Sequence, residues 1–372
     1  MSTSTITRVL PASVSDHVAT QHVTAHPLGI QLLGPAELPA ALADLANPHY
    51  VEARKWLAIL AGGLGHQPYC VRAVRDGQTV GLLPLAFVKS ALFGRFLVSL
   101  PYVNSAGVIA TDEDVAQRLL DEAVRLADKL DVRYLELRQQ REMHHAAFTH
   151  ANQSKVLMRL RLPGSSEELW TSFKSKLRSQ IKAGQKHQFE VAWGGKELLP
   201  EFYAVFSQNM RDLGTPVFPT RLFNAILEQY GSERSGPAAE FCVVRSGQQA
   251  IAAALLIHSD GVTEVPSASS LRTFNDTNCN MVLYWSLLSR AIERGQQEFD
   301  FGRSSTGSGT YRFKEQWGAQ PSPSVWQYYL RRGTVSDMRP DNAKFGLAIK
   351  LWRRLPVPLT RWLGPMIVRG IP

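Results

Sequence analysis

The sequence has 372 residues, of which 44% are hydrophobic and 20% are charged, and its formal net charge is +9. This composition excludes a mainly disordered chain, and the length suffices for two domains of ordinary size. The longest unbroken apolar run, residues 250–257, is far shorter than the roughly 20 residues that a membrane-spanning helix needs.

The first segment, residues 1–27, is rich in Ser, Thr and His and lacks the apolar stretch of a secretory signal, which predicts a mobile leader. Cys70, Cys242 and Cys279 are too few and too widely spaced for a disulfide framework or a metal-binding pair. We therefore expect reduced thiols, no metal site and a cytoplasmic location. The sequence also lacks the common hydrolase, metalloprotease and P-loop motifs.

A repeated pattern follows the leader. Residues 69–87 predict a β-hairpin with a Gly-containing turn, and residues 240–257 repeat this pattern about 170 residues later. After each hairpin comes an amphipathic helix and then a strand that ends in arginine; the helices are expected at 113–130 and 281–294, and the strands at 130–138 and 295–303. The repeat predicts two homologous α/β domains.

These domains are expected at residues 28–155 and 156–330, and residues 331–372 form a basic amphipathic tail. The positive charge is local, because residues 171–188 contain five Lys or Arg and no acid, and the tail contains nine against two acids. The rest of the chain is mildly acidic. This distribution favours specific anionic partners over general affinity for nucleic acid.

The first basic segment predicts a helix over residues 166–187. Its apolar residues recur at helical spacing and predict one buried stripe; they are Trp170, Phe173, Leu177 and Ile181. Four cations at intervals of four residues form a ridge that can bind phosphates; they are Lys174, Arg178, Lys182 and Lys186. The alternative is a solvated helix face without a ligand.

The segment 299–317 has the residue types that amide formation needs. A strand over residues 299–301 leads to Gly302 and Arg303, a Ser/Gly-rich loop follows, and then come Tyr311, Arg312 and Lys314. An amine that attacks an ester or thioester produces a tetrahedral oxyanion, which a positioned cation stabilises. The alternative is a strand, a loop and a helix with core aromatics and solvated cations.

The repeated order of hairpin, helix and strand resembles the GNAT acyltransferase fold, and two such units in tandem resemble the FemAB family. The runs EVPSASSLRTFN, NMVLYWSLLSRAIERG and FDFGRSSTGSGTYRFKEQWGAQP, together with the C-terminal LWRRLPVPLTRWLGPMIVRGIP, resemble the FemAB-like proteins associated with the exosortase/PEP-CTERM system. The resemblance implies transfer of an acyl or aminoacyl group to an amine of a cell-envelope precursor, such as one of peptidoglycan or exopolysaccharide.

The resemblance also implies roles for individual residues. Lys314, in the matching FK segment, would lie at the reaction centre, and Arg303, Tyr311, Arg312 and the basic ridge would hold substrate phosphates. Asp300 is a candidate general base or a structural partner of Arg303. Glu264 is a candidate base near the point where GNAT strands splay apart, or an exposed strand residue. The cleft between the two domains would admit the acceptor.

The sequence does not identify the acyl donor or the amine acceptor. The resemblance implies no tightly bound cofactor and an activated donor, either acyl-CoA or aminoacyl-tRNA. The run SLRTFNDTNCNMVLYW lacks the glycines of the pyrophosphate-binding loop of acetyl-CoA enzymes, which weakens the case for CoA. A phosphate-bearing acceptor such as a nucleotide sugar or a lipid-linked sugar is expected. The alternatives are a catalytically inactive GNAT pair that serves as a scaffold or carrier-lipid binder in export, and a tRNA-binding module.

The tail combines apolar, aromatic and basic residues. A helix is expected over residues 343–355, ended by Pro356 and Pro358, and residues 359–369 then mix Leu, Trp, Met and Ile with arginine. This combination suits peripheral contact with an anionic membrane, which would place the protein on the inner face of the cytoplasmic membrane. The alternative is a tail that packs on its own domains.

Overall fold

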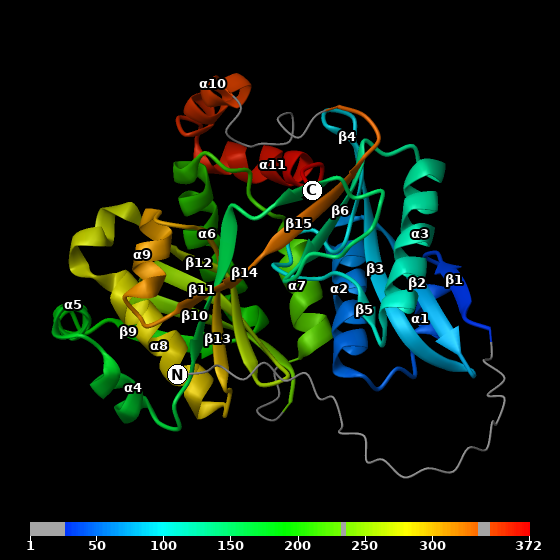
Figure 1. The fold of residues 1–372 in the computed structure, drawn as a ribbon. Helices are drawn as coiled ribbons and strands as arrows, with labels where there is room; N and C mark the ends of the chain where they lie inside the picture. The colour runs from blue at the N-terminus through cyan, green and yellow to red at the C-terminus, as the bar shows by residue number, and fades with distance from the viewer. Residues whose placement is uncertain (1–26, 232–235, 334–342) are drawn as a thin grey trace, which may run out of the picture.

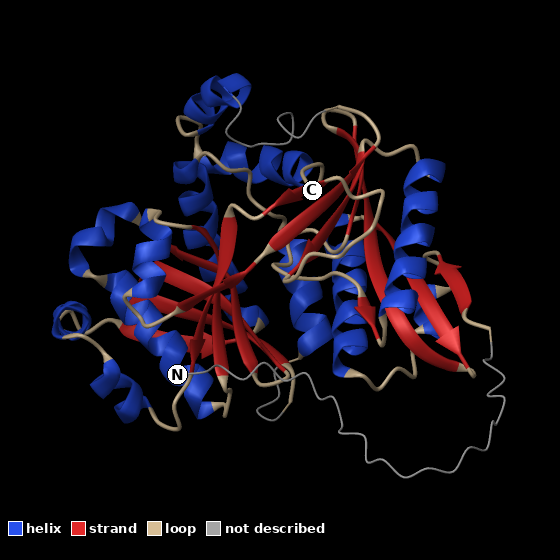
Figure 2. Cartoon of the chain, viewed as in Figure 1, coloured by secondary structure: helices blue, strands red, loops and turns tan. Residues whose placement is uncertain are grey.

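The computed structural model describes residues 27–231, 236–333 and 343–372, so the predicted leader lies almost entirely outside the described residues. Two mixed β-sheets face each other across a layer of helices, and further helices cover their outer faces (Figures 1 and 2). None of the helices in these ranges has the length and apolar character needed to cross a membrane.

The first sheet has the strand order β1-β2-β3-β4-β6-β15-β7, and β5 pairs with β3. Its strands are β1 (Gly29–Leu33), β2 (Gln67–Arg75), β3 (Gln78–Ser90), β4 (Gly94–Val98), β5 (Ile109–Ala110), β6 (Tyr134–Gln139), β7 (His150–Asn152) and β15 (Val325–Leu330). The helices of this half are α1 (Leu38–Ala41), α2 (Pro48–Leu64) and α3 (Glu113–Lys129).

The second sheet has the order β14-β8-β13-β12-β11-β10-β9. Its strands are β8 (Lys155–Arg161), β9 (Glu190–Gly194), β10 (Ala238–Ser246), β11 (Gln249–Ser259), β12 (Val262–Ser270), β13 (Glu298–Ser305) and β14 (Gln320–Pro323). Its helices are α4 (Ser166–Ser172), α5 (Ser175–Gln185), α6 (Leu199–Leu213), α7 (Thr220–Tyr230), α8 (Cys279–Glu293) and α9 (Gly309–Glu315). Two tail helices complete the chain: α10 (Ala343–Trp352) and α11 (Val357–Val368).

Both predicted hairpins are present, as β2–β3 and β10–β11. Each contains a register shift at the matching place, between Ala73 and Val74 in the first and between Val244 and Arg245 in the second. A helix and a strand follow in each half, α3 and β6 or α8 and β13. The mixed α/β architecture with two repeated units is therefore confirmed.

Three of the four hydrophobic cores among the described residues explain the layers. The central core lies between the sheets and is built on α2, α6 and α7 together with the inner faces of both sheets. The outer face of the first sheet is covered by α3, whose first turn is capped by Asp112. The outer face of the second sheet packs against α4, α5 and α8. Because one core is shared, burial of apolar surface joins the two halves as well as stabilising each one.

The chain crosses from one sheet to the other twice. The chain leaves the first sheet after β7 and enters the second as β8, whereas the later β14 lies in the second sheet and β15 returns to the first. β15 pairs with β6 and β7, and β14 pairs with β8. The last strand of the residues expected to form the second domain is therefore part of the first sheet.

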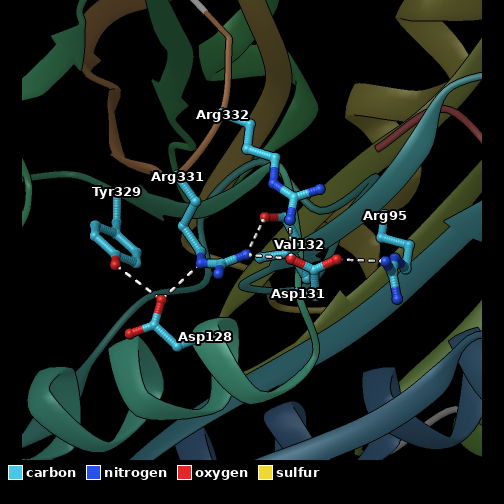
Figure 3. A network of polar contacts seen from close by, with 7 residues as sticks. All are labelled: Arg95, Asp128, Asp131, Val132, Tyr329, Arg331 and Arg332. Carbon is cyan, nitrogen blue, oxygen red and sulfur yellow. Dashed lines mark hydrogen bonds and ion pairs between the residues drawn. The ribbon is translucent and has the colours of Figure 1, made fainter.

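The end of β15 is anchored by a network of charges, shown in Figure 3. Arg331 binds the carboxylates of Asp128 and Asp131 at 2.6 and 3.0 Å, and Arg332 and Arg95 also bind Asp131, at 2.6 and 2.5 Å. The hydroxyl of Tyr329 donates to Asp128 as well. Both carboxylates lie at the C-terminal end of α3, so the network ties the returning strand to the first half.

The single helix expected over residues 166–187 is wrong. Phe173 and Lys174 have extended backbone (ψ 144° and 149°) and separate α4 from α5. The hydroxyls of Thr171 and Ser172 each donate a hydrogen bond to a backbone carbonyl one turn earlier. Such bonds compete with the backbone hydrogen bonds that would continue the helix. The extended step leaves Phe173 in edge contact with Trp317, 5.5 Å between ring centroids.

Candidate active site

The site lies where two parallel strands of the second sheet separate. β12 and β13 are paired in register from Val262 with Glu298 to Glu264 with Asp300, and the registered pairs end there. Beyond that point β12 continues beside β11, and β13 continues beside β8. The wedge between them opens into a cleft of about 330 Å³.

Both halves of the chain line this cleft. The second half contributes Glu264, Val265, Pro266, Ala268, Tyr284, Phe301, Gly302, Arg303 and Lys314, with Lys155 from β8. The first half contributes Trp56 of α2 and the loop residues Tyr102, Val103 and Asn104. The cleft expected between the two units is therefore present, and it has charged residues on an aromatic and apolar background.

A bulge in β13 shapes one wall. The pairing of β13 with β8 shifts register between Asp300 and Arg303, and Gly302 has a φ of +76°, which side chains with a Cβ rarely adopt. The Gly302 N–H donates to the Oδ1 atom of Asp300 at 2.6 Å. The bulge turns the carbonyls of Gly302 and Arg303 toward α9.

Lys314 binds these two carbonyls. Its Nζ donates to both of them at 3.0 Å, and the side chain is 9% exposed. Burial lowers the pKa of Lys314 to about 8, although Asp300 opposes this shift. An ammonium group has three N–H donors, so one donor remains for a group in the cleft that Lys314 lines.

A row of charged residues crosses three strands on the same face. Glu264, Asp300 and Arg159 are register partners on β12, β13 and β8. Asp300 is 2% exposed; it accepts a hydrogen bond from Arg159 Nε at 3.1 Å through Oδ2, and its other oxygen accepts from Gly302. The partner of Asp300 is thus Arg159, and not Arg303 as one alternative had it.

Glu264 differs from Asp300 because no described residue hydrogen-bonds to its carboxylate. The side chain is half-buried and lines the cleft. Burial raises its pKa to about 8, and repulsion from Asp300 and Glu52 adds to the increase. Glu52 is held on α2 by hydrogen bonds from Trp56, Tyr230 and Ser259. Glu264 is therefore poised to exchange a proton near neutral pH.

Arg303 stacks on an aromatic ring from the other sheet. Its guanidinium lies 3.8 Å from the ring centroid of Trp326 in β15, and Arg138 of β6 lies 4.1 Å from the same centroid. Arg138 is fully buried and bonds to Glu136 at 2.6 Å. The buried Nε of Arg303 has no partner among the described residues, and burial lowers the pKa of Arg303 to about 10. Arg303 thus places a cation in the wall of the cleft, with its Nε buried behind the surface.

The remaining predicted residues lie elsewhere. Tyr311 packs at the edge of the outer core and Arg312 is exposed on α9. The ridge residues Lys174, Arg178, Lys182 and Lys186 are exposed or half-buried beside or within α5, which packs on α8, and none of them lines the cleft. Lys182 approaches the ring of Trp170, 5.9 Å from its centroid. In the described ranges, no three His, Cys, Asp or Glu side chains group as metal ligands.

Sequence reasoning missed several cleft residues. Trp56, Tyr102 and Asn104 come from the first half and carry no local signal of a site. Lys155 and Arg159 did carry one, because they alternate with apolar residues on a strand and therefore place charge on one of its faces.

Comparison with known proteins agrees with this architecture. Residues 171–315 match the model of the acetyltransferase (GNAT) domain. No curated protein matches the sequence.

Three solved structures share the fold at low sequence identity. A FemX crystal structure has a TM-score of 0.55 and 15% identity, covering 74% of this chain and 90% of that chain. L-PGS from Bacillus licheniformis has a TM-score of 0.53 and 14% identity, with 86% and 98% covered. A tandem GNAT protein from the clavulanic acid biosynthesis pathway has a TM-score of 0.52 and 11% identity, with 82% and 100% covered. These likenesses confirm the tandem GNAT-like fold.

Proposed function

We propose that the protein is an N-acyltransferase or aminoacyltransferase of the FemAB type, which forms an amide on an amino group of a cell-envelope or exopolysaccharide precursor. The observation that carries the proposal is the open wedge between β12 and β13, with the unpaired carboxylate of Glu264 on one side and the ammonium of Lys314 on the other. The GNAT domain match over residues 171–315 supports the same reaction class.

The reaction begins with attack of the acceptor amine on the carbonyl carbon of an activated ester or thioester. Glu264 takes a proton from the attacking nitrogen, and the carbonyl oxygen becomes an oxyanion that accepts the remaining N–H of Lys314. Collapse breaks the bond to the leaving oxygen or sulfur and forms the amide. The proton held by Glu264 then passes to the leaving group, so that the carboxylate is restored.

Asp300 positions Lys314 and does not exchange a proton in this mechanism. Both of its oxygens are already bound, one by Arg159 and one by the Gly302 N–H. It therefore fixes the bulge whose carbonyls hold Lys314. The guanidinium of Arg303 lines the cleft and suits a phosphate or carboxylate group on a substrate, which fits a nucleotide sugar or lipid-linked sugar as acceptor.

The test is transfer of a labelled acyl group from acyl-CoA or aminoacyl-tRNA to amino sugars linked to a nucleotide or a lipid. Lys314→Ala should lower turnover about 100-fold or more, because it removes an oxyanion donor. The matched control is Lys129→Ala on the outside of α3. Circular dichroism should show both variants folded.

Unchanged turnover in Lys314→Ala would remove Lys314 from the mechanism. If the native protein binds a lipid-linked sugar but transfers nothing from either donor, the inactive-scaffold alternative replaces the enzyme.

A further inference from the structure

The exposed apolar side chains gather at one end of the molecule. Among the described residues, eight large hydrophobic side chains are exposed, and six of them belong to the tail: Leu347, Leu351, Leu359, Trp362, Met366 and Ile371. Figure 1 shows α10 and α11 together at the end of the molecule where β4 and the C-terminus lie. The exposure is large, 78% for Leu347 and 67% for Trp362.

The other two exposed hydrophobic residues adjoin the tail. Leu92 lies in the turn between β3 and β4, where Gly370 approaches Ser90 so closely that an added Cβ would lie 2.5 Å from its Oγ. Leu213 ends α6, and its carbonyl accepts a hydrogen bond from Arg353 at 3.1 Å. The eight residues therefore lie on the tail or on segments that contact it, and we call them together the tail face.

The tail is fixed with its apolar side outward. On α11, Thr360, Gly364 and Val368 recur every four residues and are buried, and Gly364 lies directly against Val217. Leu359, Trp362 and Met366 occupy the opposite side of the same helix and are exposed. An exposed stripe opposite a buried one is expected of a helix that binds something on each side.

Polar contacts hold this orientation. Arg361 Nε donates to the Ser207 hydroxyl of α6 at 2.7 Å. The hydroxyl of Tyr102, a cleft residue, lies 2.9 Å from the carbonyl of Val368 and 2.5 Å from that of Ile371. The tail packs on its own domains, as one alternative expected, but its large side chains remain in solvent.

The charge of the tail face indicates its partner. Residues 343–372 contain six Lys or Arg and no Asp or Glu. Lys350, Arg354 and Arg369 are exposed among the apolar side chains. Apolar residues with an exposed Trp, on two helices whose charged residues are all cations, match the interface of an anionic bilayer, where hydrophobic insertion and electrostatic attraction act together.

We propose that the tail face docks the protein on an anionic lipid surface. The proposal does not depend on acyl transfer, because it concerns binding alone. A bound bilayer would lie on the side of α11 opposite Tyr102, so that this helix connects the lipid surface to a wall of the cleft.

The test is co-sedimentation of the full chain with phosphatidylcholine vesicles that contain either no anionic lipid or about 30% phosphatidylglycerol. We expect at least about tenfold tighter binding to the anionic vesicles. Trp362→Glu combined with Met366→Glu should abolish binding, and Arg354→Glu should weaken it about fivefold. The matched control is Lys182→Glu, which makes the same charge change on α5 and should alter binding less than about twofold.

Three outcomes would overturn the proposal. The first is equal or absent binding to the two kinds of vesicle. The second is a loss for Lys182→Glu as large as that for Arg354→Glu, which would assign lipid binding to the net charge or to α5. The third is a dimer in light scattering that Trp362→Glu converts to a monomer, which would assign the tail face to a second copy of the chain. Circular dichroism of each variant separates loss of binding from loss of fold.

Discussion

The two halves of the molecule contain the same parallel strand pair, but the pair in the second half opens into a cleft, whereas a loop fills the space beside the pair in the first half. In the first half β4 and β6 are paired from Phe96 to Val98, just as β12 and β13 are paired up to Glu264. Beyond β4, Ser99 and Ala106 hydrogen-bond to the backbone of β6, so that a loop fills the space. In the second half the corresponding space is the proposed active site.

The matching arginines show how the closed and the open wedge differ in charge pairing. Arg138 and Arg303 occupy equivalent places in the repeat and stack on the same Trp326 ring. Arg138 is neutralised by Glu136, whereas the guanidinium of Arg303 forms no hydrogen bond or ion pair with a described residue. The closed wedge thus pairs its arginine with an internal carboxylate, and the open wedge leaves its arginine without one.

The largest expected effect separates these two arginines. Arg138→Met leaves the buried Glu136 without its partner and should lower the free energy of unfolding by about 3–5 kcal/mol. Arg303→Met removes a cation that has a stacking partner but no ion-pair partner, and should change the free energy of unfolding by less than about 1 kcal/mol while reducing turnover. Urea denaturation and the transfer assay measure the two quantities. Equal destabilisation by both variants would contradict the contrast between a closed and an open wedge.

The second prediction concerns pH and Glu264. Its pKa is raised from 4.5 to about 8 in the native protein, so the native state binds a proton that the unfolded state releases between these pH values. The free energy of unfolding should therefore fall as pH rises through this window, by roughly 2–4 kcal/mol, and Glu264→Gln should abolish the fall. Denaturation at several pH values tests this.

The same groups predict the activity profile. kcat/KM should rise toward pH 8 as Glu264 loses its proton and decline above it as Lys314, whose pKa is about 8, loses its charge. Lys314→Arg should remove the decline, since arginine keeps its charge. A decline that persists in this variant would assign the alkaline limb to another group.

A smaller effect is expected at the bulge. The residue that matches Gly302 in the first half is Leu137, which continues a regular strand. Gly302→Ala should lower the free energy of unfolding by about 1–2 kcal/mol, because the positive φ disfavours a Cβ, and should also reduce turnover. Gly247→Ala is the control: it has positive φ and an open surrounding at the β10–β11 turn, so it should lose similar stability with full turnover.

The smallest effect should come from the exposed network of Figure 3. Hydrogen bonding from Arg331 and the charges of Arg332 and Arg95 lower the pKa of Asp131. Asp131→Asn should slightly reduce the thermal midpoint at low salt and not at about 1 M salt, where surface charges are screened. A large, salt-independent loss would mean that this network, rather than strand pairing, holds β15.

The hairpins, α3 and α8 were predictable because their signals are local periodicities. The expected boundaries for α8, 281–294, differ from the observed Cys279–Glu293 by at most two residues. The hypothesis about Lys314 came from the resemblance, and the carbonyl partners of this residue depend on a bulge that no spacing reveals. The prediction missed the break at Phe173 because an apolar stripe fits two short helices as well as one long helix.

Other features could not be predicted because they depend on distant partners. The pairing of β15 with β6 joins segments far apart in the chain, and hydrophobic alternation alone does not choose between two sheets. The contribution of Trp56 and Tyr102 to the cleft follows from the packing of the halves on a shared core.

The return of β15 to the first sheet has a consequence for synthesis. Gln139 of β6 and Gln327 of β15 hydrogen-bond across 188 residues of sequence. During translation the first sheet must therefore wait, with the edge of β6 unpaired, until nearly the whole second half has left the ribosome. Such an edge is a template for wrong pairing. A nascent chain of this topology needs slow, protected maturation, and expression of the first half alone should yield aggregates.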